Sequence, residues 1–208
     1  MNNVSISFSF SNGFSLASKN YFTILLNTLI FAISCILASI TIVGILILPA
    51  LSGGFYFSLI QIAKGEDVGV GQIFKQGFTN FLPLLVTAIL GGLAVIIGMI
   101  LFLIPGIYLI IIWSFTIFLI VDFNIGAFES FSRSRMLVHS VGWWKTLLIF
   151  TLTSLFHYVF QLATLIPSIG NIVSILLPVF FSPFIVMVYI VYYLEVVNFH
   201  SKKENILS

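Results

Sequence analysis

The feature that most constrains this chain is a series of apolar segments, each about as long as a helix must be to cross a lipid bilayer. The first of them, residues 21–48, contains no charged residue. A bilayer core about 30 Å thick is crossed by roughly 20 residues of α-helix. Because several such segments follow one another, the sequence predicts a polytopic, α-helical membrane protein.

Composition supports this class of fold and excludes others. Of the 208 residues, 60% are hydrophobic and 7% are charged, whereas soluble domains usually carry about 25% charged residues. A transmembrane β-barrel needs alternating apolar and polar residues, but residues 24–48 are apolar on every face. The net charge of +2, without a basic block, predicts no nucleic-acid partner. The expected fold is therefore all-α, a polytopic transmembrane helical bundle.

We expect about six membrane spans. Pro105 and Gly106 are predicted to form the turn and hinge into the fourth span. The second span is short, so a re-entrant segment that leaves only five spans is the alternative. The six expected spans are residues 21–48, 49–63, 81–103, 105–122, 145–166 and 171–197.

These spans are expected to form one transmembrane domain, residues 21–198. Residues 1–20 alternate phenylalanine and other apolar residues with serines near their start. Since a single strand would have no partner in a helical membrane protein, we expect a loosely held tail or an interfacial arm there. Residues 199–208 are predicted to be a cytoplasmic tail.

The basic residues predict the orientation of the chain in the cell membrane. With six spans, every lysine and arginine lies on the side of the N-terminus, and the opposite connections carry no charge. Because basic residues are enriched in cytoplasmic loops, both termini are expected in the cytoplasm. Five spans would leave Lys19 alone outside. The eight basic residues are Lys19, Lys64, Lys75, Arg133, Arg135, Lys145, Lys202 and Lys203.

Two segments that combine polar residues with phenylalanine, residues 70–79 and 126–140, are predicted to be cytoplasmic amphipathic helices at the membrane interface. The first carries Lys75, and the second carries Arg133 and Arg135. We expect these three cations to contact anionic lipid headgroups. Arg133 also has a glutamate four residues before it, a spacing that permits an ion pair on the helix surface.

The fifth expected span has a polar face, where Thr153, His157 and Gln161 follow one another at intervals of four residues. At 1.5 Å per residue, His157 lies about 20 Å along the helix from Trp144. An ionisable group at such a depth is a candidate for function by default. The sequence nevertheless favours a neutral histidine, hydrogen-bonded to Gln161 or to a neighbouring helix, over a role in transport.

No motif in the sequence predicts catalysis, a metal or a cofactor. The histidines, His139, His157 and His200, form neither an H-E-x-x-H pattern nor a metal-ligand spacing with Cys35. The chain also has no P-loop and no G-x-S-x-G motif. We therefore expect a protein that is not an enzyme and has no cofactor.

The central stretch contains IPGIYLIIIWSF, LIVDFNIGAFESFSRSRML and GWWK. In these motifs the chain resembles, over residues 48–150, a family of bacterial and archaeal integral membrane proteins that includes the membrane domain fused to some glycerophosphoryl diester phosphodiesterases. GQIFKQGF at residues 71–78 is similar to the family's F-K-x-G-F element. The chain departs at Ser130, where the family more often has alanine. The matching residues are Pro105, Gly106, Tyr108, Asp122, Gly126, Glu129 and Ser134.

The resemblance implies a topology but no activity, because nothing here corresponds to the fused soluble phosphodiesterase. Two functions therefore stay open. The first is a scaffold or lipid-interacting module, with membrane lipids, another membrane protein or a second copy as partners. The alternative is a transporter or channel for a small solute. Gly91-Gly92 in the third span, with Pro178 and Pro183 in the sixth, supports it, since broken helices in corresponding halves are typical of transporters.

Overall fold

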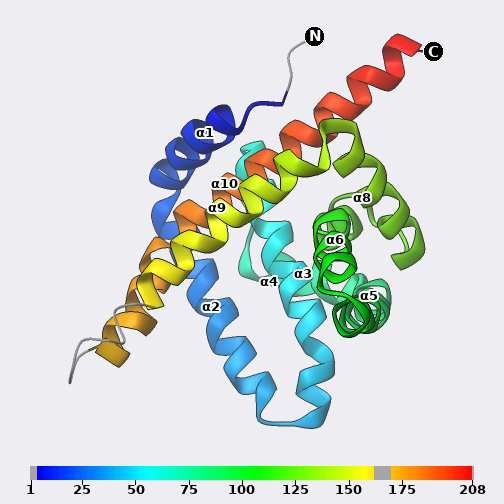
Figure 1. The fold of residues 1–208 in the computed structure, drawn as a ribbon. Helices are drawn as coiled ribbons and strands as arrows, with labels where there is room; N and C mark the ends of the chain where they lie inside the picture. Colours follow the sequence, from blue (N-terminus) through cyan, green and yellow to red (C-terminus); the bar gives the residue numbers. More distant parts are fainter. Residues whose placement is uncertain (1–3, 162–169, 208) are drawn as a thin grey trace. The chain divides into compact units, whose positions relative to one another are not determined.

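The computed structural model describes residues 4–161 and 170–207, and this part of the chain is helical with short connections and no strand (Figure 1). The predicted all-α class is therefore confirmed. The helices are α1 (Ile6–Lys19), α2 (Tyr21–Ser39), α3 (Ile42–Lys64), α4 (Val70–Thr79), α5 (Phe81–Leu101), α6 (Leu103–Ile112), α7 (Thr116–Phe123), α8 (Ala127–Val141), α9 (Trp143–Gln161) and α10 (Gly170–Leu207).

Five segments in the described part of the chain are long and apolar enough to cross a membrane. The span expected at residues 145–166 corresponds to α9, which is not among these five and whose expected end lies outside the described residues. The helices thus fit a polytopic membrane protein. The five segments are α2, α3, α5, Leu103–Phe123 of α6 and α7, and Leu177–Lys202 of α10.

The boundary between the first two spans differs from the prediction, because the chain turns after Ser39 and not at Pro49. Thr41 begins α3 by accepting a hydrogen bond at its Oγ1 from the N–H of Gly44, at 2.9 Å. This side chain satisfies one of the backbone donors that a helix start leaves free. Pro49 lies inside α3, whose 23 residues are enough for a full crossing.

The described chain divides into two compact units. One unit comprises Met1–Leu29 with Trp144–Ser208, and the other comprises Ile30–Trp143. The boundary falls within α2, so a continuous apolar helix conceals it in the sequence.

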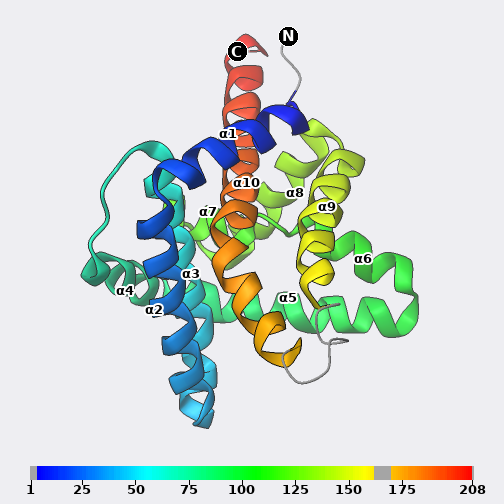
Figure 2. The same ribbon diagram turned by 90° about the vertical axis from the view of Figure 1, so that its left-hand side faces the viewer.

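The N-terminal segment, where the sequence predicted a loosely held tail or an interfacial arm, is a helix packed along α10 (Figures 1 and 2). Ser9, Gly13 and Ala17 form its buried face. A Cβ atom on Gly13 would lie only 2.6 Å from the Cα of Val188, so glycine permits this close approach. Glu195 of α10 accepts hydrogen bonds from the Ser5 N–H at 2.8 Å and from the Ser9 hydroxyl at 2.9 Å. The carboxylate thus holds the start of α1.

Helix α10 continues through Pro178 and Pro183, where we expected an interruption. A proline has no N–H to donate to the carbonyl four residues earlier. For Pro183 that carbonyl belongs to Val179, and the hydroxyl of Ser182 donates to it at 2.8 Å. The neighbouring serine therefore supplies the missing bond, which explains why the helix does not break here.

In the second unit, α3 packs against α4, α5 and α7. Its contact with α4 is very close, because a Cβ on Gly77 would lie 2.2 Å from the carbonyl oxygen of Ala50. Helix α4 is therefore fixed to a membrane span by its backbone, not only laid on a surface.

Helices α5 and α6 form a hairpin that runs across α3. Helix α3 is upright in both views, whereas α5 is nearly end-on in Figure 1 and lengthwise in Figure 2.

The turn between the third and fourth spans is made by one extended residue, Phe102, with φ −157° and ψ 135°. Pro105 and Gly106, which we predicted to form this turn, lie inside the first turn and a half of α6. Proline is tolerated there because N–H groups at a helix start have no partner within the helix. Gly106 is buried against Met99 of α5.

Candidate functional site

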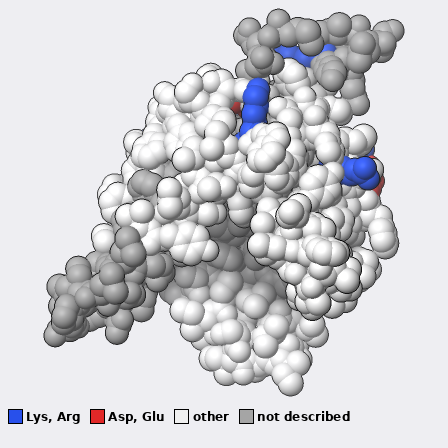
Figure 3. Space-filling view, viewed as in Figure 1, with Lys and Arg blue, Asp and Glu red and all other residues white. Residues whose placement is uncertain are grey.

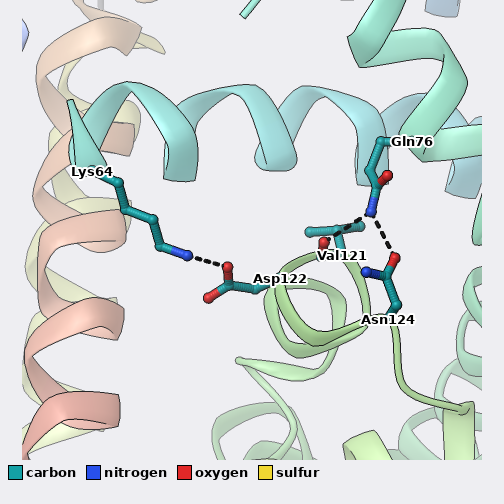
Figure 4. Close-up of polar contacts among 5 residues, drawn as sticks. All are labelled: Lys64, Gln76, Val121, Asp122 and Asn124. Atoms are coloured by element: carbon teal, nitrogen blue, oxygen red, sulfur yellow. Dashed lines mark hydrogen bonds and ion pairs between the residues drawn. The ribbon is translucent and has the colours of Figure 1, made fainter. Parts of the chain in front are cut away.

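A polar network joins α3, α4 and α7 in the second unit (Figure 4). Lys64, the last residue of α3, forms an ion pair with Asp122 near the end of α7. The Asp122 side chain is only 5% exposed, while that of Lys64 is 38% exposed. The lysine thus neutralises a nearly buried carboxylate while keeping partial contact with the surroundings.

The second part of this network is built from amides. Gln76 of α4 donates from its Nε2 to the Asn124 Oδ1 at 2.7 Å and to the Val121 carbonyl at 3.2 Å (Figure 4). Asn80, between α4 and α5, also donates to the Asn124 Oδ1, at 3.0 Å. Asn124 ends α7 in the left-handed conformation, with φ 52° and ψ 42°, which asparagine tolerates well. The network therefore caps α7 and fixes α4 to it.

The fourth expected span is not a continuous helix, since α6 ends at Ile112 and α7 starts at Thr116. Ser134 of α8 lies at the break and is fully buried. Its hydroxyl donates to the Ile112 carbonyl at 2.7 Å and accepts from the Phe115 N–H at 3.2 Å. One side chain thus satisfies a backbone acceptor and a backbone donor that the broken helix leaves free.

An open, mostly apolar groove of about 580 Å³ lies next to this break. Its walls come from α3, α5, the residues around the break, and α8. Trp113 and Phe131 form one wall, with ring centroids 4.7 Å apart. Thr87 on α5 also lines the groove, and its hydroxyl oxygen is buried with no hydrogen-bond partner among the residues that the structure describes. The volume is within the range of small-molecule sites.

The three predicted headgroup contacts differ in their surroundings. Lys75 on α4 and Arg135 on α8 are exposed and have no ion-pair partner in the described part of the chain. Arg133 forms an ion pair with Glu129 at 2.7 Å, as the spacing in the sequence permitted. Both partners of this pair are about half exposed, so its contribution to stability is small. Lys75 and Arg135 are therefore the better candidates for an external anion.

The predicted polar face of the fifth span is described only in part. The Thr153 hydroxyl donates to the carbonyls of Ile149 and Phe150, at 2.8 and 3.0 Å, and is satisfied within α9. The side chains of His157 and Gln161 lie outside the described residues. Of this predicted polar site, only Thr153 thus lies within the described side chains.

Sequence reasoning missed Ser134, Gln76 and Asn124. Ser134 appeared only as a position that matched a family pattern, and its role depends on a helix break that the apolar sequence conceals. Asn124 carried a usable indication, because asparagine after an apolar segment often ends a helix. The partners of both residues are far away in the sequence.

The arrangement offers hydrogen bonds, one ion pair and apolar surface. Among the described residues, no group of three or more histidine, cysteine, aspartate or glutamate side chains is placed to hold a metal ion. Comparison with known proteins adds no assignment: the chain matches no protein-family model, no curated protein and no solved structure.

Proposed function

We propose that this chain is a non-enzymatic, multi-pass membrane protein that binds membrane lipids through the exposed faces of α4 and α8. The observation that carries the proposal is the exposed face of α8. There Phe128 is 73% exposed and Met136 is 48% exposed, and Arg135 is also exposed on the same face. Large apolar side chains next to a cation are typical of helices that lie against a membrane.

Helix α4 supports the same function with a second, similar face. Phe78 is 49% exposed and lies three residues from the exposed Lys75. The hydrogen bonds of Gln76 and the close contact at Gly77 hold the helix in place before any lipid binds. Because the helix is already ordered, lipid binding would not have to offset the entropy of folding it.

The orientation that we propose takes α9 as a sixth crossing beside the five long apolar segments, which places both termini in the cytoplasm and the chain in the cell membrane. It is supported by the distribution of basic residues and by the uncharged hairpin of residues 30–63, whose Ile36, Ile40 and Ile42 are 65%, 74% and 82% exposed. The surface of this hairpin in Figure 3 shows no charged side chain. The resemblance to the phosphodiesterase-associated membrane domains is part of this proposal and supports topology alone.

A lipid-binding measurement on purified protein tests the proposal. The protein is reconstituted into vesicles of phosphatidylcholine and phosphatidylglycerol, extracted in mild detergent, and analysed for the two lipids that copurify. Each cation near an anionic leaflet contributes about 1 kcal/mol. Replacing Lys75 and Arg135 together by glutamine should therefore lower the preference for phosphatidylglycerol by roughly thirtyfold.

Arg133→Gln is the matched control, because the charge of Arg133 is already paired with Glu129. It should change the preference much less than the double variant. If the double variant retains the lipid preference of the original protein, lipid binding by these helices is refuted.

Transport of a small solute is the second candidate, because the break between α6 and α7 lies next to the groove, and broken spans often line transport sites. However, α5 is continuous through Gly91-Gly92, and the backbone groups at the break are bonded to Ser134. Few polar groups thus remain for a solute. Solute uptake by proteoliposomes that is lost in Thr87→Val would favour this candidate.

A further inference from the structure

The groove next to the helix break offers an apolar surface and little else. Its walls are mainly helices that are long and apolar enough to cross a membrane. Ser52 and Thr116 contribute hydroxyls to the lining, but each donates to a nearby backbone carbonyl, Ser52 to Leu48 at 3.0 Å and Thr116 to Trp113 at 2.5 Å. Thr87 also lines the groove, and its hydroxyl has no partner among the described residues, but that oxygen is itself buried. A ligand of this groove is therefore expected to be apolar over most of the surface that touches the walls.

A cation follows the groove residue Phe131 by one turn of α8. Arg135 follows Phe131, which lines the groove, by four residues, so the two side chains are neighbours on one face of the helix. Because side chains on a helix lean toward its N-terminus, the long side chain of Arg135 can reach back toward Phe131. Arg135 has no ion-pair partner in the described part of the chain, whereas Arg133 and Glu129 neutralise each other. The charge of Arg135 is thus not neutralised by an ion pair within the described part of the chain.

We infer that the groove holds one acyl chain of an anionic glycerophospholipid whose phosphate is bound by Arg135. The inference rests on the proposed lipid-binding function and names the class of lipid and its site. An apolar chain matches the lining, and an anionic headgroup matches the unpaired arginine. A helix of a second copy would fill the groove but leave Arg135 without an anion.

Trp113 in the groove wall provides a direct measurement. The chain has three tryptophans, so Trp143→Phe together with Trp144→Phe leaves Trp113 as the only fluorescent indole. Dibrominated acyl chains quench tryptophan on contact. The protein is reconstituted into phosphatidylcholine vesicles that contain increasing fractions of dibrominated phosphatidylglycerol, or of dibrominated phosphatidylcholine as the reference.

Trp113 should be quenched preferentially by the anionic lipid, at low mole fractions and to saturation. Arg135→Gln should lower this preference about fivefold, from the contribution of one cation near an anionic phosphate. Gly92→Leu should abolish the preferential quenching, because its side chain enters open space at the groove, where nothing lies within 4 Å of a Cβ at this position. Leu93→Phe, on the exposed side of α5, adds volume outside the groove and should change nothing.

Equal quenching by both lipids would show a groove filled by bulk lipid and would overturn the inference. Absence of quenching would show a groove covered by protein and would overturn it too, as would an unchanged signal in Gly92→Leu. The copurification experiment separates this failure from failure of the proposed function. If Lys75→Gln with Arg135→Gln still lowers the total phosphatidylglycerol while Trp113 shows no preference, the helices bind lipid but the groove does not.

Discussion

Replacing Ser134 by alanine is expected to destabilise the second unit, because this hydroxyl serves both sides of the break between α6 and α7. The change removes two hydrogen bonds, to the Ile112 carbonyl at 2.7 Å and from the Phe115 N–H at 3.2 Å. Ser134, Ile112 and Phe115 are all buried, with exposed fractions of 0%, 4% and 0%. Water thus cannot replace the lost partner in the folded protein.

The expected loss follows from these two backbone groups. Leaving one buried donor or acceptor unsatisfied costs about 1–3 kcal/mol. In membrane proteins the measured value for a polar contact is often lower, about 0.6 kcal/mol on average, because the unfolded state in the membrane also finds partners. For two groups we therefore expect a loss of about 2 kcal/mol in the free energy of unfolding.

The free energy of unfolding is measured by titrating SDS into the protein in mild detergent. Two serines on the same helix are matched controls: Ser132 is exposed, and the Ser130 hydroxyl donates only within α8, to Ala127 at 2.7 Å. Ser132→Ala should cost less than about 0.5 kcal/mol. If Ser134→Ala differs from Ser132→Ala by less than that amount, the break is satisfied in another way and the role of Ser134 is refuted.

Three further changes test the contacts around this core. Gly77→Val should lower the free energy of unfolding by about 2 kcal/mol or more, because the new side chain clashes with α3. Gly71→Val, where a Cβ meets open space, is the control and should cost less than about 1 kcal/mol. A similar loss in both variants would contradict the close packing of α4 on α3. Lys64→Gln should lower the free energy of unfolding by about 1–2 kcal/mol, because it leaves the nearly buried Asp122 carboxylate without its lysine. Adding Asp122→Asn removes that charge and should recover part of the loss. If the double variant is no more stable than Lys64→Gln, the ion pair is excluded as the cause. Reporter fusions after Lys64 and at the C-terminal tail should lie in the cytoplasm and a fusion after Phe102 outside, so an external signal from the tail would refute the orientation.

The sequence predicted the helices and the membrane-spanning character of the chain. It also predicted the ends of those helices whose polar and apolar residues follow a clear helical period. The amphipathic segments predicted at residues 70–79 and 126–140 correspond to Val70–Thr79 and Ala127–Val141. Their polar and apolar residues alternate with a helical period, so each boundary has a visible cause. Apolar length alone predicted the membrane segments, because roughly 20 residues are needed for each crossing.

The breaks inside apolar segments could not be predicted in the same way. Residues 107–118 are apolar except for the tyrosine hydroxyl and the small polar residues Ser114 and Thr116, so no periodicity indicates that α6 ends at Ile112. The turn after Ser39 did have an indication, since Thr41 is a good helix cap, but Pro49 was the more conspicuous residue. Proline in a membrane helix often leaves the helix intact, which is why it was a poor guide here.

The polar network was beyond sequence reasoning for a different reason. Gln76 and Asn124 lie 48 positions apart, and each alone is an ordinary polar residue near a helix end. Only the close packing of α4 on α3, which depends on Gly77, brings them together. A tertiary contact thus decides which polar residues become partners.

Two serine hydroxyls, those of Ser134 and Ser182, share a physical task, and the task of Ser134 links the break in the fourth span to the groove. Ser134 and Ser182 each bind a backbone carbonyl where a regular helical bond is missing, one at a break and one before a proline. Ser134 lies three residues from Phe131 on α8, and Phe131 contacts Trp113 at the other edge of the break. The same helix that satisfies the broken backbone therefore also builds the groove wall. Because these contacts are shared, loosening the break in Ser134→Ala should also disturb the surface that Trp113 presents to a bound acyl chain, whereas the loss of Ser132 should leave it intact.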